Sequence, residues 1–128
     1  MGRARLTLSN FEGANLEQAD LGEARMNDAK LAGAVLDDAY LYLTVLFRAD
    51  MRGVSAERAT LTEAELRSAN LEGAVLRNAD LRGADLAGAN LSNADFRNAR
   101  LLSASLHETI QVGTIFTGAI MPDNSVAR

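Results

Sequence analysis

The stretch ADLRGADLAGANLSN, residues 79–93, places a leucine at every fifth position and an alanine two positions before each leucine. The same spacing extends over almost the whole chain. A large apolar residue occupies every fifth position from Leu6 to Leu106, with Ala56 as the exception, and a small residue stands two positions before each of them. This period of five decides the fold.

A period of five fits neither regular secondary structure. Residues five apart on an α-helix are rotated by about 140° from each other, so the leucines would spiral around the axis instead of forming a stripe. On a straight strand they would alternate between the two faces, and half of them would point into water. The spacing instead predicts a short extended step, in which both repeating residues point inward, followed by a two-residue corner.

A second period shows how many such steps close one coil. Residues that tolerate positive φ recur every 20 positions at one corner, namely Gly13, Gly33, Gly53, Gly73, Asn93 and Gly113. We therefore expect one corner in four to adopt positive φ, and a coil with four sides of five residues each. The chain has room for about six such coils, which at the usual strand spacing would form a rod roughly 29 Å long.

The repeats resemble the pentapeptide-repeat family, whose consensus A(D/N)LXX is matched by Ala79-Asp80-Leu81-Arg82-Gly83 and by Ala89-Asn90-Leu91-Ser92-Asn93. The resemblance implies an all-β fold, a right-handed quadrilateral parallel β-helix of about six 20-residue coils. It predicts a single domain over 1–128, with repeats over about 4–121 and a short C-terminal cap over 122–128. The resemblance implies no common activity: the functions of most family members are unknown, and the known ones are binding functions.

Three local features depart from the regular repeat pattern. At Val54-Ser55-Ala56 the small and large residues are exchanged, which keeps the total volume and predicts local repacking. Phe96 and Phe116, 20 residues apart, are expected to stack near the C-terminal end. Pro122 has no N–H group and is expected to end the strand pairing.

Composition excludes several classes of site. The 128 residues contain no cysteine and a single histidine, His107, so disulfides, thiolate metal sites and histidine-based metal sites cannot be built. We expect no catalytic, cofactor-binding or metal-ligating residue, and therefore no enzyme. The chain shows no apolar segment of signal-peptide or membrane-spanning length, which predicts a cytoplasmic protein that does not bind membranes.

Two groups of outward apolar residues are candidate contact surfaces. The first, an interaction surface, consists of Tyr40, Tyr42, Leu43, Val45 and Phe47. The alternative is that Tyr40 and Phe47 only cover the alkyl parts of neighbouring side chains. The second group, a C-terminal self-contact, consists of Ile110, Val112, Ile115 and Ile120.

The sequence therefore predicts a non-enzymatic protein-interaction module or scaffold for an unknown protein partner, with a possible homodimer through the coil end or the apolar wall. The resemblance suggests one alternative, a DNA mimic that binds DNA gyrase. The net charge of −4 over the length of the rod is about one charge per 7 Å, whereas duplex DNA carries about one per 1.7 Å. Outward positions also alternate in sign, and without a basic row no nucleic-acid binding is expected.

Overall fold

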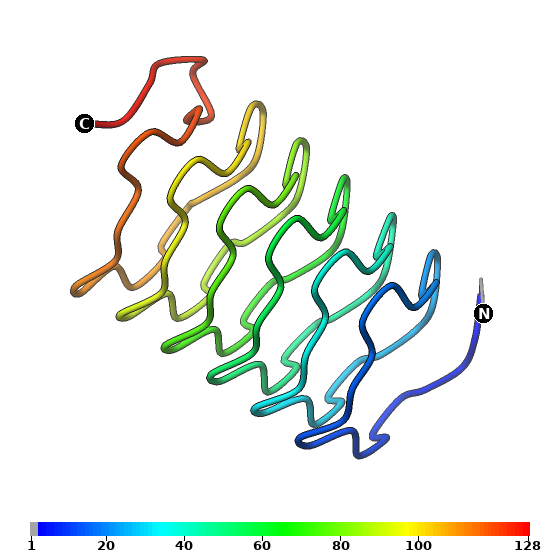
Figure 1. The fold of residues 1–128 in the computed structure, drawn as a ribbon. Coiled ribbons are helices and arrows are strands. Elements are labelled where there is room, and N and C mark those ends of the chain that lie inside the picture. The colour runs from blue at the N-terminus through cyan, green and yellow to red at the C-terminus, as the bar shows by residue number, and fades with distance from the viewer. Residues whose placement is uncertain (1–2) are drawn as a thin grey trace.

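The computed structural model describes residues 3–128, which wind into a four-sided coil that rises steadily from the N-terminal to the C-terminal end (Figure 1). Within this range there is no helix, and every β-contact is an isolated bridge between single residues. All the parallel bridges join residues 20 positions apart, in four ladders that start at Arg5, Asn10, Asn15 and Asp20. We name the four sides of the coil after these residues. Each ladder holds six residues, which agrees with about six coils.

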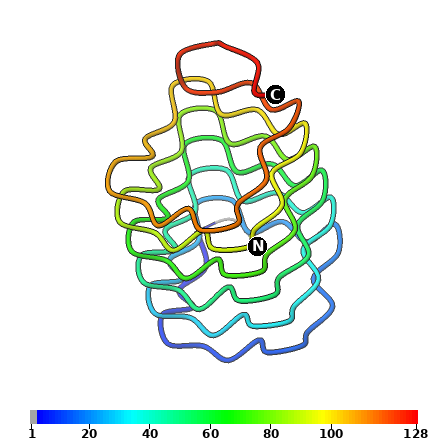
Figure 2. The ribbon, with the colours of Figure 1, turned by 90° about the vertical axis from the view of Figure 1, so that its left-hand side faces the viewer.

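The interior is lined by the two inward residues of each repeat, as expected. From Leu21 to Leu101 every residue at these positions is buried, and Leu61 in the middle of the stack is 0% exposed. Burial of each such leucine contributes about 1.5–3 kcal/mol, so stability is summed along the rod. The interior is open only toward the two ends, where these residues are partly buried: Leu6, Phe11, Leu16, Leu106, Phe116 and Met121. Figure 2 shows the coils lying behind one another around this common interior.

The backbone N–H groups of one repeat illustrate how the coils are joined. Asp80 donates to the preceding coil at 2.9 Å, and Leu81 and Gly83 donate to the following coil at 2.7 and 3.0 Å. Ala84 closes the corner by donating to the Leu81 carbonyl at 3.0 Å. The remaining N–H, that of Arg82, donates to Oδ1 of Asp80 at 3.2 Å. An aspartate or asparagine at this position therefore completes the hydrogen bonding of the repeat, as in an Asx-turn.

The corners correct one expectation. Positive φ is not confined to one corner in four, because the second corner residue has positive φ at every corner from Arg3 to Gly118, including Leu43 at 54°. A turn closed by the fourth residue's N–H, with positive φ at its third residue alone, is a type II β-turn. The conformation costs a non-glycine residue roughly 1–2 kcal/mol. At most corners the N–H of that residue is bonded to the next coil, as from Asp38 to the Glu57 carbonyl at 2.9 Å, which helps to hold the conformation. Glu108 and Gly113, at the open end, have positive φ without such a bond.

The C-terminal residues correct a second expectation. Pairing does not end at Pro122, because the chain turns back and Val126 forms an antiparallel bridge with Ile120. Ala127 also donates its N–H to the Ala119 carbonyl at 2.9 Å. The tail, the red segment that doubles back at the C-terminal end in Figure 2, thus covers the last coil on the Asp20 side.

The irregular interior positions are accommodated without disturbing the coil. Val54 and Ala56 are both 0% exposed, and Ser55 between them keeps both parallel bridges of its ladder. The exchanged volumes are therefore absorbed by repacking. The rings of Phe96 and Phe116 are stacked, with centroids 5.3 Å apart and an interplanar angle of 20°.

Candidate interaction surface

The predicted apolar wall extends around two corners of the coil. Tyr40 points outward from the Asp20 side, Tyr42 and Leu43 form the next corner, and these three are 57%, 45% and 37% exposed. Val45 lies on the Arg5 side and Phe47 on the corner that follows it, and both are half-buried and so less exposed than the first three residues. The Phe47 ring lies beneath the guanidinium of the arginine that follows it, 4.9 Å from the ring centroid. The most accessible part of the wall is therefore Tyr40, Tyr42 and Leu43.

A surface hollow of about 420 Å³ lies beside the two tyrosines, lined by Asp20, Gly22, Glu23, Tyr40 and Tyr42. Gly22 occupies the same corner position as Tyr42, one coil earlier, and has no side chain to fill the space. Asp20 Oδ1 accepts the Gly22 N–H at 3.0 Å. The hollow thus combines two aromatic rings with two carboxylates.

A buried threonine fixes the corner that carries Tyr42. Thr44 is 0% exposed at an inward position that is otherwise mostly alanine, and its Oγ1 donates to the Leu21 carbonyl at 2.8 Å. The corner is thereby tied to the coil that contains Gly22. Sequence reasoning missed this role, although a polar residue among the inward alanines was the signal that could have shown it.

Three repeats contain the pattern Asp-x-Arg, in which the arginine folds back on the aspartate. The pairs are Asp50 with Arg52, Asp80 with Arg82, and Asp95 with Arg97. Between Asp80 and Arg82 the contact is bidentate, with Nε at 2.8 Å from Oδ1 and Nη2 at 2.6 Å from Oδ2. These pairs were not predicted from the sequence.

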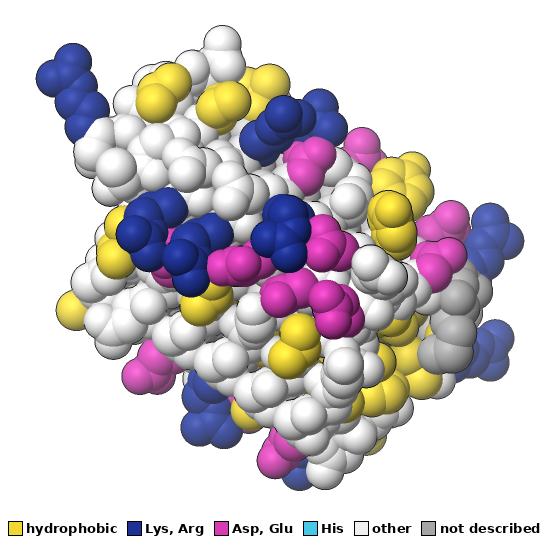
Figure 3. Space-filling view, viewed as in Figure 1, with side chains coloured by type: hydrophobic (Ala, Val, Ile, Leu, Met, Phe, Trp, Pro, Cys, Tyr) yellow, Lys and Arg dark blue, Asp and Glu magenta, His cyan; other side chains and the backbone are white. Residues whose placement is uncertain are grey.

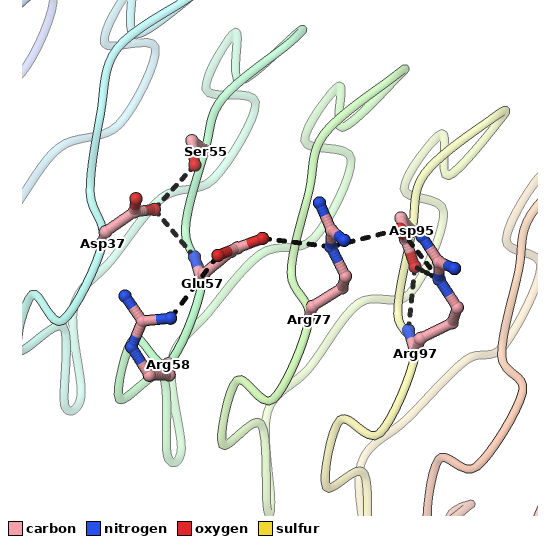
Figure 4. A network of polar contacts seen from close by, with 7 residues as sticks. All are labelled: Asp37, Ser55, Glu57, Arg58, Arg77, Asp95 and Arg97. Atoms are coloured by element: carbon pink, nitrogen blue, oxygen red, sulfur yellow. Dashed lines mark hydrogen bonds and ion pairs between the residues drawn. The ribbon is translucent and has the colours of Figure 1, made fainter.

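Charged side chains also connect coils along the corner after the Asn15 side (Figure 4). Arg77 Nε lies 3.0 Å from Glu57 Oε1 in the coil before it and 3.4 Å from Asp95 Oδ2 in the coil after it. Earlier in the same corner, Asp37 Oδ1 accepts the Ser55 hydroxyl at 2.6 Å and the Glu57 N–H at 3.0 Å. The opposite charges of Glu57 and Arg77, 20 positions apart, were the sequence signal for the first of these contacts. Figure 3 shows the resulting interleaving of acidic and basic groups.

These contacts shift the pKa of the aspartates downward. The hydrogen bonds from the Arg97 side chain hold the pKa of Asp95 below its ordinary value, against the opposing effect of partial burial, and the charge of Arg77 adds to this. The Arg52 side chain lowers the pKa of Asp50 in the same way. Both carboxylates are therefore already paired with arginines of the same chain.

The predicted C-terminal self-contact surrounds the last coil. Ile110, Val112 and Ile115 are 50%, 70% and 42% exposed, and they lie on the Asn10 side, the next corner and the Asn15 side. Ile120 is half-buried, and it forms a parallel bridge with Arg100 and an antiparallel bridge with Val126 of the tail. On the coil edge beside the exposed residues several N–H groups have no acceptor within residues 3–128: those of Leu106, Glu108, Gln111, Gly113 and Phe116.

Other kinds of site are not assembled by the described part of the chain. Among residues 3–128 no three histidine, cysteine, aspartate or glutamate side chains are grouped so that they could hold a metal ion. His107 has a 75% exposed side chain and lies 3.5 Å from the Glu108 carboxylate. No helix in this range is long and apolar enough to cross a membrane.

Comparison with known proteins places the chain among repeat proteins. A family model described as pentapeptide repeats matches residues 9–46, 39–78 and 74–110. No curated protein sequence matches the chain. Among solved structures, the pentapeptide repeat protein Rfr23 from the cyanobacterium Cyanothece 51142 is 27% identical, with a TM-score of 0.60, over 97% of this chain and 91% of that protein. Trypsin-treated QnrB1, a plasmid-mediated fluoroquinolone resistance protein, is 20% identical with a TM-score of 0.64; this chain is covered to 93% and spans 63% of QnrB1.

Proposed function

Since the chain belongs to the pentapeptide-repeat family and has its right-handed quadrilateral β-helix, we propose that it is a non-enzymatic protein-interaction module. The observation that supports this most directly is the exposed group Tyr40, Tyr42 and Leu43 beside the hollow. Tyrosine supplies a large contact area with few rotatable bonds and is enriched among the residues that dominate binding energy. A cytoplasmic location remains part of the proposal.

The regular backbone suits such a role. The coils are joined by hydrogen bonds at every repeat, and Thr44 anchors the corner that carries the surface. The exposed rings are therefore presented on a rigid support, so binding would require little ordering of the backbone.

The charge distribution favours this function over a DNA mimic that binds DNA gyrase. A mimic needs a continuous row of negative charge, whereas here Asp50, Asp80 and Asp95 are each paired with an arginine. The net charge is only −4. The likeness to QnrB1, at 20% identity, is a likeness of fold alone.

A capture experiment in host lysate tests the proposal. The immobilised wild-type chain is compared with Tyr42→Glu and with Thr62→Glu, which introduces the same charge at the same corner position one coil later. We expect a partner that binds the wild type and Thr62→Glu but not Tyr42→Glu, with the fold of each variant verified by circular dichroism. Equal recovery by all three proteins would overturn the proposed surface.

A further inference from the structure

We propose that the hollow beside Tyr40 and Tyr42 binds an arginine side chain from a basic segment of the protein partner. The inference rests on the proposed interaction function and deepens it, because it assigns the chemistry that the surface recognises. It is carried by a comparison between repeats of the same chain.

The repeat at Asp80 shows how the coil holds a guanidinium at this kind of corner. Asp80 and Asp20 belong to the same ladder, on the same side of the coil. Two residues after Asp80, Arg82 lies on the corner and makes two hydrogen bonds to the carboxylate, at 2.8 and 2.6 Å. Two residues after Asp20, the corresponding position is Gly22. The repeat at Asp20 thus has the carboxylate but lacks the arginine.

The missing side chain leaves both a space and an uncompensated charge. Gly22 is one of the residues that line the hollow of about 420 Å³. Asp20 uses Oδ1 to accept the Gly22 N–H, and within residues 3–128 no arginine or lysine lies within ion-pair distance of its carboxylate. Other aspartates at this position do have such a partner: Asp85, which has alanine instead of arginine two residues later, lies 3.9 Å from Arg67 of the preceding coil.

The rest of the lining also suits a planar cation. Tyr40 and Tyr42 offer aromatic rings, on which a guanidinium can stack more favourably than an ammonium group. Glu23 already pairs with Arg3, whose Nε lies 3.0 Å from Glu23 Oε2, so one cation is bound at the rim by the chain itself. Bidentate pairing with Asp20 would favour arginine over lysine. In Figure 3 apolar side chains lie beside acidic ones toward the N-terminal end of the face shown.

The test is an NMR titration of the full chain, labelled with ¹⁵N, with the peptide acetyl-Gly-Arg-Gly-amide. We expect saturable shifts of the Gly22, Tyr42 and Leu43 amides. The same peptide with citrulline, a neutral analogue of arginine of nearly the same shape, should bind about tenfold more weakly, because it cannot form the charged pair. Equal shifts with both peptides, or no shift with either, would overturn the proposal.

Two variants and a control locate the binding. Asp20→Asn keeps the acceptor for the Gly22 N–H and removes the charge, so binding should weaken about tenfold. Gly22→Arg should abolish binding by supplying the guanidinium internally. The φ of Gly22 is not positive, and an added Cβ would lie 3.2 Å from Asp20 Oδ1, so the substitution requires a small movement of that carboxylate. The control Glu72→Gln removes one negative charge on a different corner and should leave binding unchanged. Unaltered peptide binding by Gly22→Arg would contradict the assignment.

The capture experiment separates this inference from the proposed function. Partner capture that is lost in Tyr42→Glu but unchanged in Asp20→Asn and Gly22→Arg would overturn the arginine site and leave the interaction surface supported. Capture that is unchanged in Tyr42→Glu would overturn the surface itself.

Discussion

The Thr44 hydroxyl donates a hydrogen bond to the Leu21 carbonyl at 2.8 Å, and this bond joins the corner that carries Tyr42 to the coil beneath it. The same Leu21 carbonyl also accepts the Ala24 N–H at 3.0 Å. Loss of the hydroxyl would therefore weaken the corner without leaving this carbonyl unpaired. The candidate surface depends on that local anchor.

Thr44→Val should lower the free energy of unfolding by about 1 kcal/mol, because it removes a buried hydrogen bond while keeping the volume. Urea denaturation followed by circular dichroism measures the change. Thr109→Val, near the open C-terminal end, is the control, since its hydroxyl donates to the Leu106 carbonyl and accepts from the Gln111 side chain, both in its own coil. A Thr44→Val protein as stable as the wild type would show that the bond contributes nothing to the corner.

Gly73→Ala should be destabilising by roughly 1–2 kcal/mol for conformational reasons alone. The φ of Gly73 is +69°, and no atom lies within 4 Å of the place an added Cβ would take. Gly73→Asn should cost less, because asparagine tolerates this region better. Urea denaturation of the two variants measures the free-energy cost of positive φ for a residue with a side chain. Equal stability of Gly73→Ala and the wild type would contradict the corner geometry.

Asp95→Asn should reduce the dependence of stability on acid pH. The pKa of Asp95 is lowered in the folded state from its ordinary value of 3.8, so its contribution to stability is present above that value and is lost as the pH falls through the folded-state pKa. Asparagine keeps the acceptor for the Arg97 N–H but not the charge. Wild type should therefore exceed Asp95→Asn in urea midpoint at pH 7, and the difference should shrink between pH 4 and pH 2. A constant difference across that range would show that the ion pairs do not stabilise the fold.

Self-association through the C-terminal coil is the prediction that concerns oligomeric state. We expect a homodimer at high concentration, because Ile110, Val112 and Ile115 add exposed apolar area to a coil edge with unpaired N–H groups. Ile115→Lys should weaken the dimer in sedimentation equilibrium.

Two controls place the contact in that experiment. Leu8→Lys, at the opposite end of the rod, should have no effect unless the copies stack head to tail, and Tyr42→Glu should have none unless the apolar wall is the contact. A chain that stays monomeric up to millimolar concentration would refute the dimer.

The sequence alone determined the architecture. Inward side chains recur every five residues and one glycine or asparagine corner every 20, and a period that fits neither helix nor flat strand leaves few ways to bury Leu81, Leu86 and Leu91 together. The stacked phenylalanines and the repacking at Val54 followed from the same alignment. These features depend only on which residues face inward, which the period specifies.

The tertiary structure decided what lies outside the interior. Positive φ occurs at every corner, and at most corners the N–H of that residue is bonded to the next coil, so a residue such as Leu43 adopts it against its own preference. The return of the tail onto Ile120 is decided by the unpaired edge of the last coil, which the local sequence after Pro122 does not encode. The hollow at Gly22 exists because Tyr40 and Tyr42 line a space beside a residue that has no side chain. Outward side chains obtain their partners from coils 20 residues away, and their contacts are therefore fixed only when the coils are stacked.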